Sequence, residues 1–383
     1  MASSIASSWR ELSGEKCWKD LLHPLDLDLR RYIIHYLQRA GAAGDPFNGN
    51  KASKGYGLSL YPPDEFFARD GLGIANPYRY QVTNFIYAAT STNESEWFGY
   101  VAVATDDGKA ALGRRDILVS WRGTITNVDW ADDAKFFPTS AKELFKTDLA
   151  QVHSGFLSIY TGTVDSPYST TSAKEQVRSA VKEQVDKYQN EDVSITVVGH
   201  SLGAALATLN AMDIVFNGFN TPTDSDKAFM VTAFTAASPR VGNEFFRGVF
   251  DFDELKHLRL LRIVNTTDPI PKVPWLHGFY VHVGEKLEID TTKSTYLKSN
   301  ANPHNLDVYA HGVAGVQENG EFKLEEELDF DNAVVNKHGD CLLDESKIPI
   351  EWWNNEKFKG MVQMDNGHWK FVDSAYVPEP PNA

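Results

Sequence analysis

Ser201 lies in the pattern Gly-x-Ser-x-Gly, between Gly199 and Gly203. A β-branched run at 194–198 precedes the pattern and a small-residue, helix-forming stretch follows from 204. Together they predict a strand, a tight turn and a helix, an arrangement that exposes a serine hydroxyl on a strained turn. The helix N-terminus would favour negative charge beside that hydroxyl. The predicted chemistry is nucleophilic acyl transfer with Ser201 as the nucleophile.

Such a serine needs a histidine to take its proton and a carboxylate to orient that histidine, in the chain order Ser, Asp, His. The apolar segment 260–264 predicts a strand that ends before Asp268, and Pro269 would hold the loop that carries this carboxylate. We therefore expect Asp268 to be the acid. His304 joins a polar loop to a helical pattern and is the preferred base. His311, about two helical turns further along, is the alternative.

A tetrahedral oxyanion intermediate needs two preorganised N–H donors. The backbone N–H of Leu202 is expected to be one of them, because it follows the nucleophile directly. The other is expected at Thr124, since the predicted strand 117–121 runs into Gly123, which permits a sharp turn. His200 adjoins the nucleophile in sequence, but its side chain should leave the turn in another direction, so we interpret it as structural.

Bulky apolar residues alternate with acidic ones directly after Thr124. They include Val128, Trp130 and Phe136. Such a segment could form a lid that covers an apolar cleft in water and turns its apolar side to lipid. It could equally be a fixed loop that buries Trp130, and the residues alone do not decide between the two.

Positioning these residues requires an alternation of strands and helices. The expected strands are 85–88, 100–104, 116–121, 194–198, 229–236 and 258–264, and the expected helices are 172–188 and 204–216. This order predicts an α/β fold with a mostly parallel central sheet flanked by helices. We expect one domain over 1–383, with a helical N-terminal extension at about 1–80 and a C-terminal appendage at about 318–383.

The composition narrows the class of protein. Of the 383 residues, 42% are hydrophobic and 23% charged, which excludes a disordered chain. The net charge of −15 argues against nucleic acid as a partner and against long-range attraction to anionic membranes.

No apolar run reaches the roughly 18 residues of a membrane span. The start lacks the apolar core of a secretory signal, so we expect a cytoplasmic location. No metal-ligand motif occurs, and no cofactor is expected.

Several motifs, in order, resemble the class 3 lipases. They are Val-Ser-Trp-Arg-Gly-Thr at 119–124, Gly-His-Ser-Leu-Gly at 199–203, Ala-Ala-Ser-Pro-Arg-Val-Gly at 236–242, the Asp268 loop and His304-Asn305-Leu306. Other segments resemble the plant phospholipase A1 group that lacks a plastid transit peptide. These are 9–12, 18–31, 113–116 and 153–156. The resemblance covers the chain from residue 9 to beyond 315.

The resemblance implies an α/β-hydrolase fold and hydrolysis of the sn-1 acyl ester of glycerolipids, without a metal, in the cytosol. It assigns Ser201 as nucleophile, His304 as base and Asp268 as the orienting acid. Thr124 and Leu202 become the oxyanion donors, and the stretch after Thr124 the lid. The expected partners are a glycerolipid substrate and a lipid surface met transiently. Two other functions stay open: a non-catalytic lipase-like binding module and a serine esterase for soluble esters.

Overall fold

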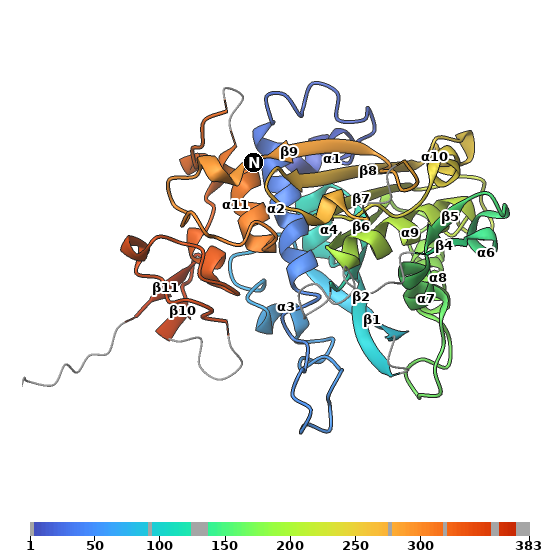
Figure 1. Cartoon of the computed structure of the whole chain (residues 1–383), viewed down its shortest axis with the longest axis horizontal. Helices are drawn as coiled ribbons and strands as arrows, with labels where there is room; N and C mark the ends of the chain where they lie inside the picture. Colours follow the sequence, from blue (N-terminus) through green and yellow to red (C-terminus); the bar gives the residue numbers. More distant parts are fainter. Residues whose placement is uncertain are drawn as a thin grey trace, which may run out of the picture.

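A seven-stranded sheet forms the centre of the protein (Figure 1). The computed structural model describes residues 4–90, 94–123, 137–274, 278–316, 320–353 and 360–372. The strand order is β1-β2-β3-β6-β7-β8-β9. These strands are β1 Tyr80–Ala89, β2 Ser95–Ala104, β3 Arg115–Trp121, β6 Val193–His200, β7 Met230–Ala236, β8 Leu258–Asn265 and β9 Glu285–Ile289. The pairings from β3 to β9 are parallel, whereas β1, β2 and β3 pair antiparallel.

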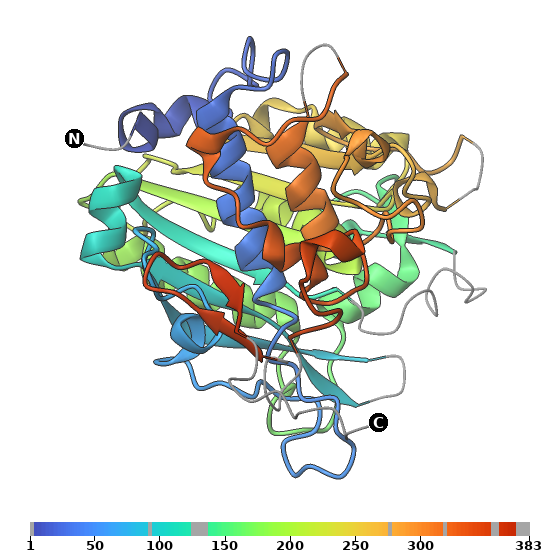
Figure 2. The ribbon, with the colours of Figure 1, turned by 90° about the vertical axis from the view of Figure 1, so that its left-hand side faces the viewer.

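Helices cover both faces of the sheet, because its central strands are apolar on both sides. In β3, Val119 faces a core built with α7 (Ser154–Thr161), α8 (Ala173–Lys187) and α9 (Leu202–Phe216). Its neighbour Leu118 faces a second core built with α1 (Ser4–Leu12), α2 (Leu27–Gly41) and α11 (Leu306–Gly315). Figure 2 shows α2 and α11 side by side across this second face.

The remaining α-helices and strands of the described residues are short. They are α3 Phe66–Arg69, α4 Asp106–Leu112, β4 Pro138–Ser140, α6 Lys142–Phe145, β5 Gln151–His153, α10 Glu244–Phe250, β10 Met361–Gln363 and β11 Trp369–Phe371. The strands β10 and β11 form a hairpin, as do β4 and β5. Among the described residues, no helix is both long and apolar enough to cross a membrane.

The observed elements confirm the expected strands and helices, and the mostly parallel sheet with helices on both faces. The edge strand β9 was not expected. Its sequence, Glu-Lys-Leu-Glu-Ile, buries only Leu287 and Ile289 and lacks the long apolar run of an inner strand.

The N-terminal and C-terminal segments meet on the α2–α11 face. Lys337, from the C-terminal segment, forms an ion pair with Asp45, which follows α2. Within the C-terminal segment, the Trp352 and Trp369 rings lie 4.7 Å apart. The division into an extension at about 1–80 and an appendage at about 318–383 stays a prediction.

Candidate active site

Ser201 lies at the turn between β6 and α9, with φ of 59° and ψ of −123°. Its flanking glycines are required by close approaches of the backbone. A Cβ atom at Gly199 would lie 2.2 Å from the Gly203 carbonyl oxygen, and one at Gly203 would lie 2.2 Å from the Trp121 carbonyl oxygen. The Ser201 N–H donates to the Ala236 carbonyl of β7 at 3.0 Å. The sheet and the helix therefore hold the serine in a backbone conformation that side chains rarely adopt.

The positive φ of Ser201 should destabilise the folded protein, and glycine at this position should remove that strain. We therefore expect the free energy of unfolding of Ser201→Gly to be about 1 kcal/mol higher than that of Ser201→Ala. Both variants lose the hydroxyl, so their difference isolates the positive φ at this position. Urea denaturation of the two variants measures it. Equal stabilities, or a less stable glycine variant, would show that the turn is not strained.

Three side chains far apart in the sequence meet at this turn. The His304 Nε2 atom lies 2.9 Å from the Ser201 hydroxyl oxygen. Its Nδ1 atom lies 2.8 Å from Asp268 Oδ2. The Asp268 side chain is fully buried, and that of His304 is 16% exposed. With Nδ1 protonated and bonded to the carboxylate, Nε2 is free to accept the serine proton.

Two further donors hold the Asp268 carboxylate. The Tyr309 hydroxyl, from α11, donates to Oδ2 at 2.6 Å, and the Ile270 backbone N–H donates to Oδ1 at 2.9 Å. Burial, and next the charge of Asp268, raise the pKa of Tyr309 well above its usual value, so its hydroxyl stays a donor. Tyr309 was missed by the sequence analysis. The only local signal was its place five residues after His304, on the helix that His304 precedes.

Removing the Tyr309 hydroxyl tests its support of Asp268. We expect Tyr309→Phe to lower kcat about three- to ten-fold, because one hydrogen bond to a buried carboxylate is lost while the histidine contact remains. Steady-state hydrolysis by the folded variant measures this. An unchanged kcat would show that Ile270 N–H and His304 suffice to hold the carboxylate.

The backbone around His304 is held from two sides. The His200 Nε2 atom lies 2.8 Å from the His304 carbonyl oxygen, and Asn265 Nδ2 donates to the Pro303 carbonyl at 3.0 Å. Burial first, and then the neighbouring His304, lower the pKa of His200 well below its usual value, so His200 stays neutral and donates from Nε2. His200 is thus structural, as expected, but its role as an anchor of His304, like that of Asn265, was not foreseen.

His311, the alternative base, lies elsewhere. Its side chain is buried, its Nε2 atom is 2.8 Å from the Ser294 hydroxyl, and its ring stacks on Phe322. Burial lowers the pKa of His311 to about 4. Among the described contacts, none joins His311 to Ser201 or Asp268. The geometry therefore favours His304 as the base.

Of the two expected oxyanion donors, the structure describes Leu202 but not Thr124. Leu202 is the first residue of α9, and the first N–H groups of a helix have no partner within it, so its N–H is available beside Ser201. Thr124 lies outside the described residues, as do Val128, Trp130 and Phe136 of the expected lid. Gly123, the last described residue before them, approaches the turn: a Cβ atom there would lie 3.7 Å from Ser201 Cβ.

Comparison with known proteins gives one family. The family model described as Lipase (class 3) matches residues 118–277. Phospholipase A1-IIbeta of Arabidopsis thaliana is 45% identical over 397 residues, which cover 97% of this chain and 94% of that protein. Phospholipase A1-IIgamma of the same plant is 46% identical, with coverages of 96% and 93%. Among solved structures, the nonglycosylated LIP2 lipase of Yarrowia lipolytica is 20% identical, with a TM-score of 0.48, covering 70% of this chain and 81% of that one.

The expected fold class is confirmed by the observed sheet together with this family match. The matched residues 118–277 run from β3 through the Asp268 loop and contain Ser201 and Asp268. His304 and Tyr309 lie beyond that stretch, within the longer alignments to the plant proteins.

Proposed function

We propose that this chain, which belongs to the class 3 lipase family, is a phospholipase A1. Such an enzyme is a serine acylhydrolase that cleaves the sn-1 acyl ester of glycerophospholipids. The observation that carries the proposal is the chain of contacts from the Ser201 hydroxyl through His304 to buried Asp268. Galactolipids and acylglycerols present the same ester and are further candidate substrates.

The first half of the reaction acylates the serine. His304 Nε2 takes the Ser201 proton while the serine oxygen attacks the ester carbonyl carbon. Asp268 orients the imidazole and stabilises its positive charge. The tetrahedral intermediate collapses when the C–O bond to the glycerol oxygen breaks, and His304 returns the proton to that oxygen. The lysolipid leaves, and the acyl group stays on Ser201.

The second half hydrolyses the acyl-enzyme. Water loses a proton to His304 and attacks the acyl carbonyl, and the fatty acid leaves as Ser201 recovers its proton. In both halves the Leu202 N–H stabilises the oxyanion, a donor whose loss costs about 3 kcal/mol of barrier in comparable enzymes. The role of Thr124 as second donor, and of the following stretch as a lid, belongs to the proposal.

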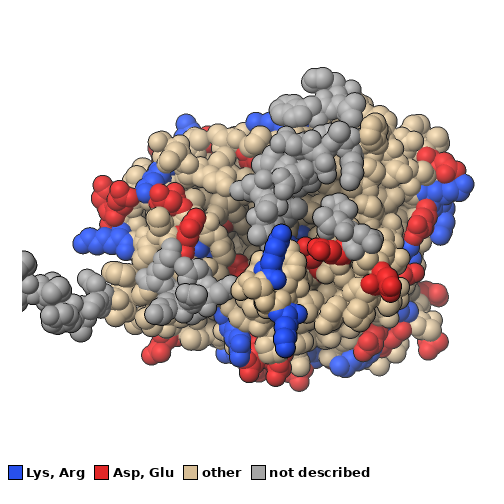
Figure 3. Space-filling model, turned by 60° about the horizontal axis from the view of Figure 1, so that its bottom comes forward, with Lys and Arg blue, Asp and Glu red and all other residues tan. Residues whose placement is uncertain are grey.

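Contact with lipid is proposed to depend on apolar side chains. On the face shown in Figure 3, Lys and Arg are interspersed with Asp and Glu instead of forming a basic patch, and the net charge is −15. Phe137, Leu149 and Phe245 are 70%, 58% and 56% exposed. The segments that carry them adjoin one another. Phe137 directly precedes β4, which pairs with β5, and Asn243 bonds both to the first residue of β5 and to the Leu149 carbonyl. Uncharged or zwitterionic lipid surfaces suit such a region best.

Positional analysis of the products tests the proposal. Phosphatidylcholine with different acyl chains at sn-1 and sn-2 should release the sn-1 fatty acid and leave a 2-acyl lysolipid, and Ser201→Ala should release neither. A galactolipid and a diacylglycerol with the same acyl chains rank the head groups. Release of the sn-2 chain would contradict the proposal. Hydrolysis of soluble esters at rates that do not change when micelles form would favour the esterase, and no turnover of any ester would favour the binding module.

A further inference from the structure

The segment 236–242, Ala-Ala-Ser-Pro-Arg-Val-Gly, has no part in the proposed mechanism, yet it adjoins the candidate active site. It begins at the end of β7, where the Ala236 carbonyl accepts the Ser201 N–H at 3.0 Å. The backbone then turns at Ala237, which has a φ of 54° and donates its N–H to the Ile263 carbonyl of β8 at 3.1 Å. Both alanines are buried. The start of the segment is therefore fixed to the turn that carries the serine and to β8.

Arg240, further along the segment, bonds to the Asp268 turn, the residues 268–274 that follow β8. Its backbone N–H donates to the Val273 carbonyl at 2.9 Å. Its guanidinium Nη1 atom donates to the Pro274 carbonyl at 3.1 Å and also to the Lys272 carbonyl. Three successive carbonyl oxygens of one turn therefore accept hydrogen bonds from a single arginine.

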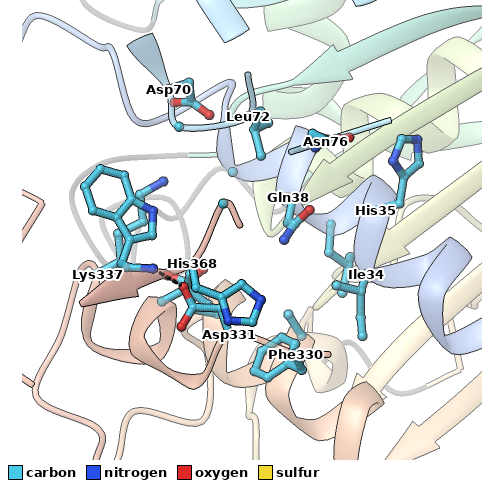
Figure 4. A pocket seen from close by; sticks show the side chains of 18 of the residues that line it. Ile34, His35, Gln38, Asp70, Leu72, Asn76, Phe330, Asp331, Lys337 and His368 are labelled. Carbon is cyan, nitrogen blue, oxygen red and sulfur yellow. Dashed lines mark hydrogen bonds between the residues drawn. The ribbon is translucent and has the colours of Figure 1, made fainter. Parts of the chain in front are cut away.

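The guanidinium of Arg240 serves the backbone and not an acid, since it forms no ion pair within the described part of the chain. Other cations of the protein pair with carboxylates. Lys337, which lines a cavity on the α2–α11 face (Figure 4), is bonded to Asp45, and Arg122 donates to Glu96 at 2.7 Å. Because the guanidinium carries several donors in a rigid fork, one arginine can hold several acceptors in place. The contacts of Arg240 thus favour a role in fixing the Asp268 turn.

The Asp268 turn supports the carboxylate at its other end. Residues Ile270–Lys272 form a short 3-10 helix, which the Val273 N–H closes by donating to the Ile270 carbonyl at 3.1 Å. At the start of this helix, the Ile270 N–H donates to Asp268 Oδ1 at 2.9 Å. The turn is short and hydrogen-bonded throughout, so a shift of its last residues would move the N–H that holds the carboxylate.

His282 supports the same turn from a second direction. Its Nε2 atom lies 2.8 Å from the Pro271 carbonyl oxygen. Burial, and next the charge of Arg262, lower the pKa of His282 to about 3, so the ring stays neutral and donates from Nε2. The carbonyl groups of the Asp268 turn are therefore held by side chains from two other segments, and the donors of Arg240 are the larger set.

We propose that Arg240 is a positioning residue, which holds the Asp268 turn in register with the turn that carries Ser201. The carboxylate then stays in contact with His304. This inference rests on the proposed function, because it requires His304 to act as the base. The serine and the carboxylate are linked twice, through the imidazole at 2.9 and 2.8 Å and through the backbone of segment 236–240. Loss of the guanidinium leaves two carbonyls of the turn without this donor, and a catalytic group displaced by about 1 Å can cost about 100-fold in rate.

Kinetics of the full chain with Arg240 replaced test the inference. We expect Arg240→Ala to lower kcat on a phosphatidylcholine about ten- to one hundred-fold, with KM changed less than about two-fold. Arg240→Lys should recover part of kcat, because its ammonium still donates to a carbonyl. Arg240→Met keeps the length without any donor and should recover nothing. Arg69→Ala, at an exposed arginine of α3 that pairs with Glu65, is the matched control and should keep full kcat.

A double-mutant cycle separates positioning from a general loss of structure. If Arg240 acts through Asp268, Arg240→Ala should cost less than about two-fold more in a chain that already carries Asp268→Asn. Independent effects would multiply instead. The rate at which a fluorophosphonate labels Ser201 gives the same cycle without a lipid substrate, and melting temperatures show that each variant is folded. Where Arg240→Ala is unfolded at the assay temperature, the comparison of Arg240→Lys with Arg240→Met decides.

The labelling experiment tells apart the two ways in which the inference could fail. Slow labelling of Arg240→Ala beside fast labelling of the original chain supports it, whichever ester the protein hydrolyses. No labelling of Ser201 in the original chain would contradict the proposed function and, with it, this inference. Fast labelling of the original chain and of Arg240→Ala alike would overturn the role of Arg240 alone, as would equal kcat values for the Lys and Met variants or losses that multiply with Asp268→Asn.

Discussion

Replacing Ser201 by alanine should lower kcat about 10⁵- to 10⁶-fold, because no other group in the described site can form the acyl-enzyme. The hydroxyl lies 2.9 Å from His304 Nε2 and makes no other side-chain hydrogen bond within the part of the chain that the structure describes, so its loss should leave the fold intact. Hydrolysis of a phosphatidylcholine by the purified variant, with its melting temperature measured in parallel, gives both quantities.

A second serine variant controls for losses of activity that any serine-to-alanine change or the purification itself would cause. The exposed Ser158 donates only to the Gly155 carbonyl within α7, and Ser158→Ala should keep full activity. If Ser201→Ala retained more than a few per cent of the activity, the nucleophile would have to be another residue, and the mechanism proposed above would be wrong.

Asp268→Asn is expected to lower kcat about 10⁴-fold while leaving the serine and the histidine in place. The carboxylate accepts from His304 Nδ1, Tyr309 and the Ile270 N–H. An amide nitrogen placed toward Nδ1 would donate where the carboxylate accepts. The imidazole would then hold its proton on Nε2, where it cannot take the proton of Ser201. The loss should appear in kcat far more than in KM.

The matched control is Asp251→Asn, at the exposed C-terminal end of α10, which should leave kcat unchanged. A loss of less than ten-fold in a folded Asp268→Asn protein would show that Asp268 only supports the structure of the loop. His304 would then need a different orienting group.

The residues of the candidate site were predictable where the chemistry leaves a local pattern. The Gly199-to-Gly203 turn joins a strand to a helix, and both glycines prove to be sites where a Cβ would collide with backbone. Asp268 follows a strand and precedes a proline, and His304 precedes a helix. The loop-to-helix position favoured His304, but His311, about two helical turns further along, stayed as the alternative, because it could share the same helix face. The structure decides in favour of His304, because the path of α11 buries His311 against Phe322.

Contacts that join distant parts of the chain leave no such pattern. Asn265 reaches Pro303 across 38 positions, and Asp45 meets Lys337 across 292. Neither residue type nor spacing predicts these pairs, so the anchors of His304 and the ion pair between Asp45 and Lys337 were missed. Strand β9 was missed for a related reason: as an edge strand it buries only two side chains and carries little hydrophobic signal.

Trapping the acyl-enzyme tests the central claim most directly. The protein is mixed with a short-chain ester, quenched in acid, digested and analysed by mass spectrometry. We expect the acyl group on the peptide that contains Ser201, and on no peptide of Ser201→Ala treated in the same way. An acyl group on a different residue, or steady turnover with Ser201 never modified, would contradict the assignment of Ser201 as the nucleophile.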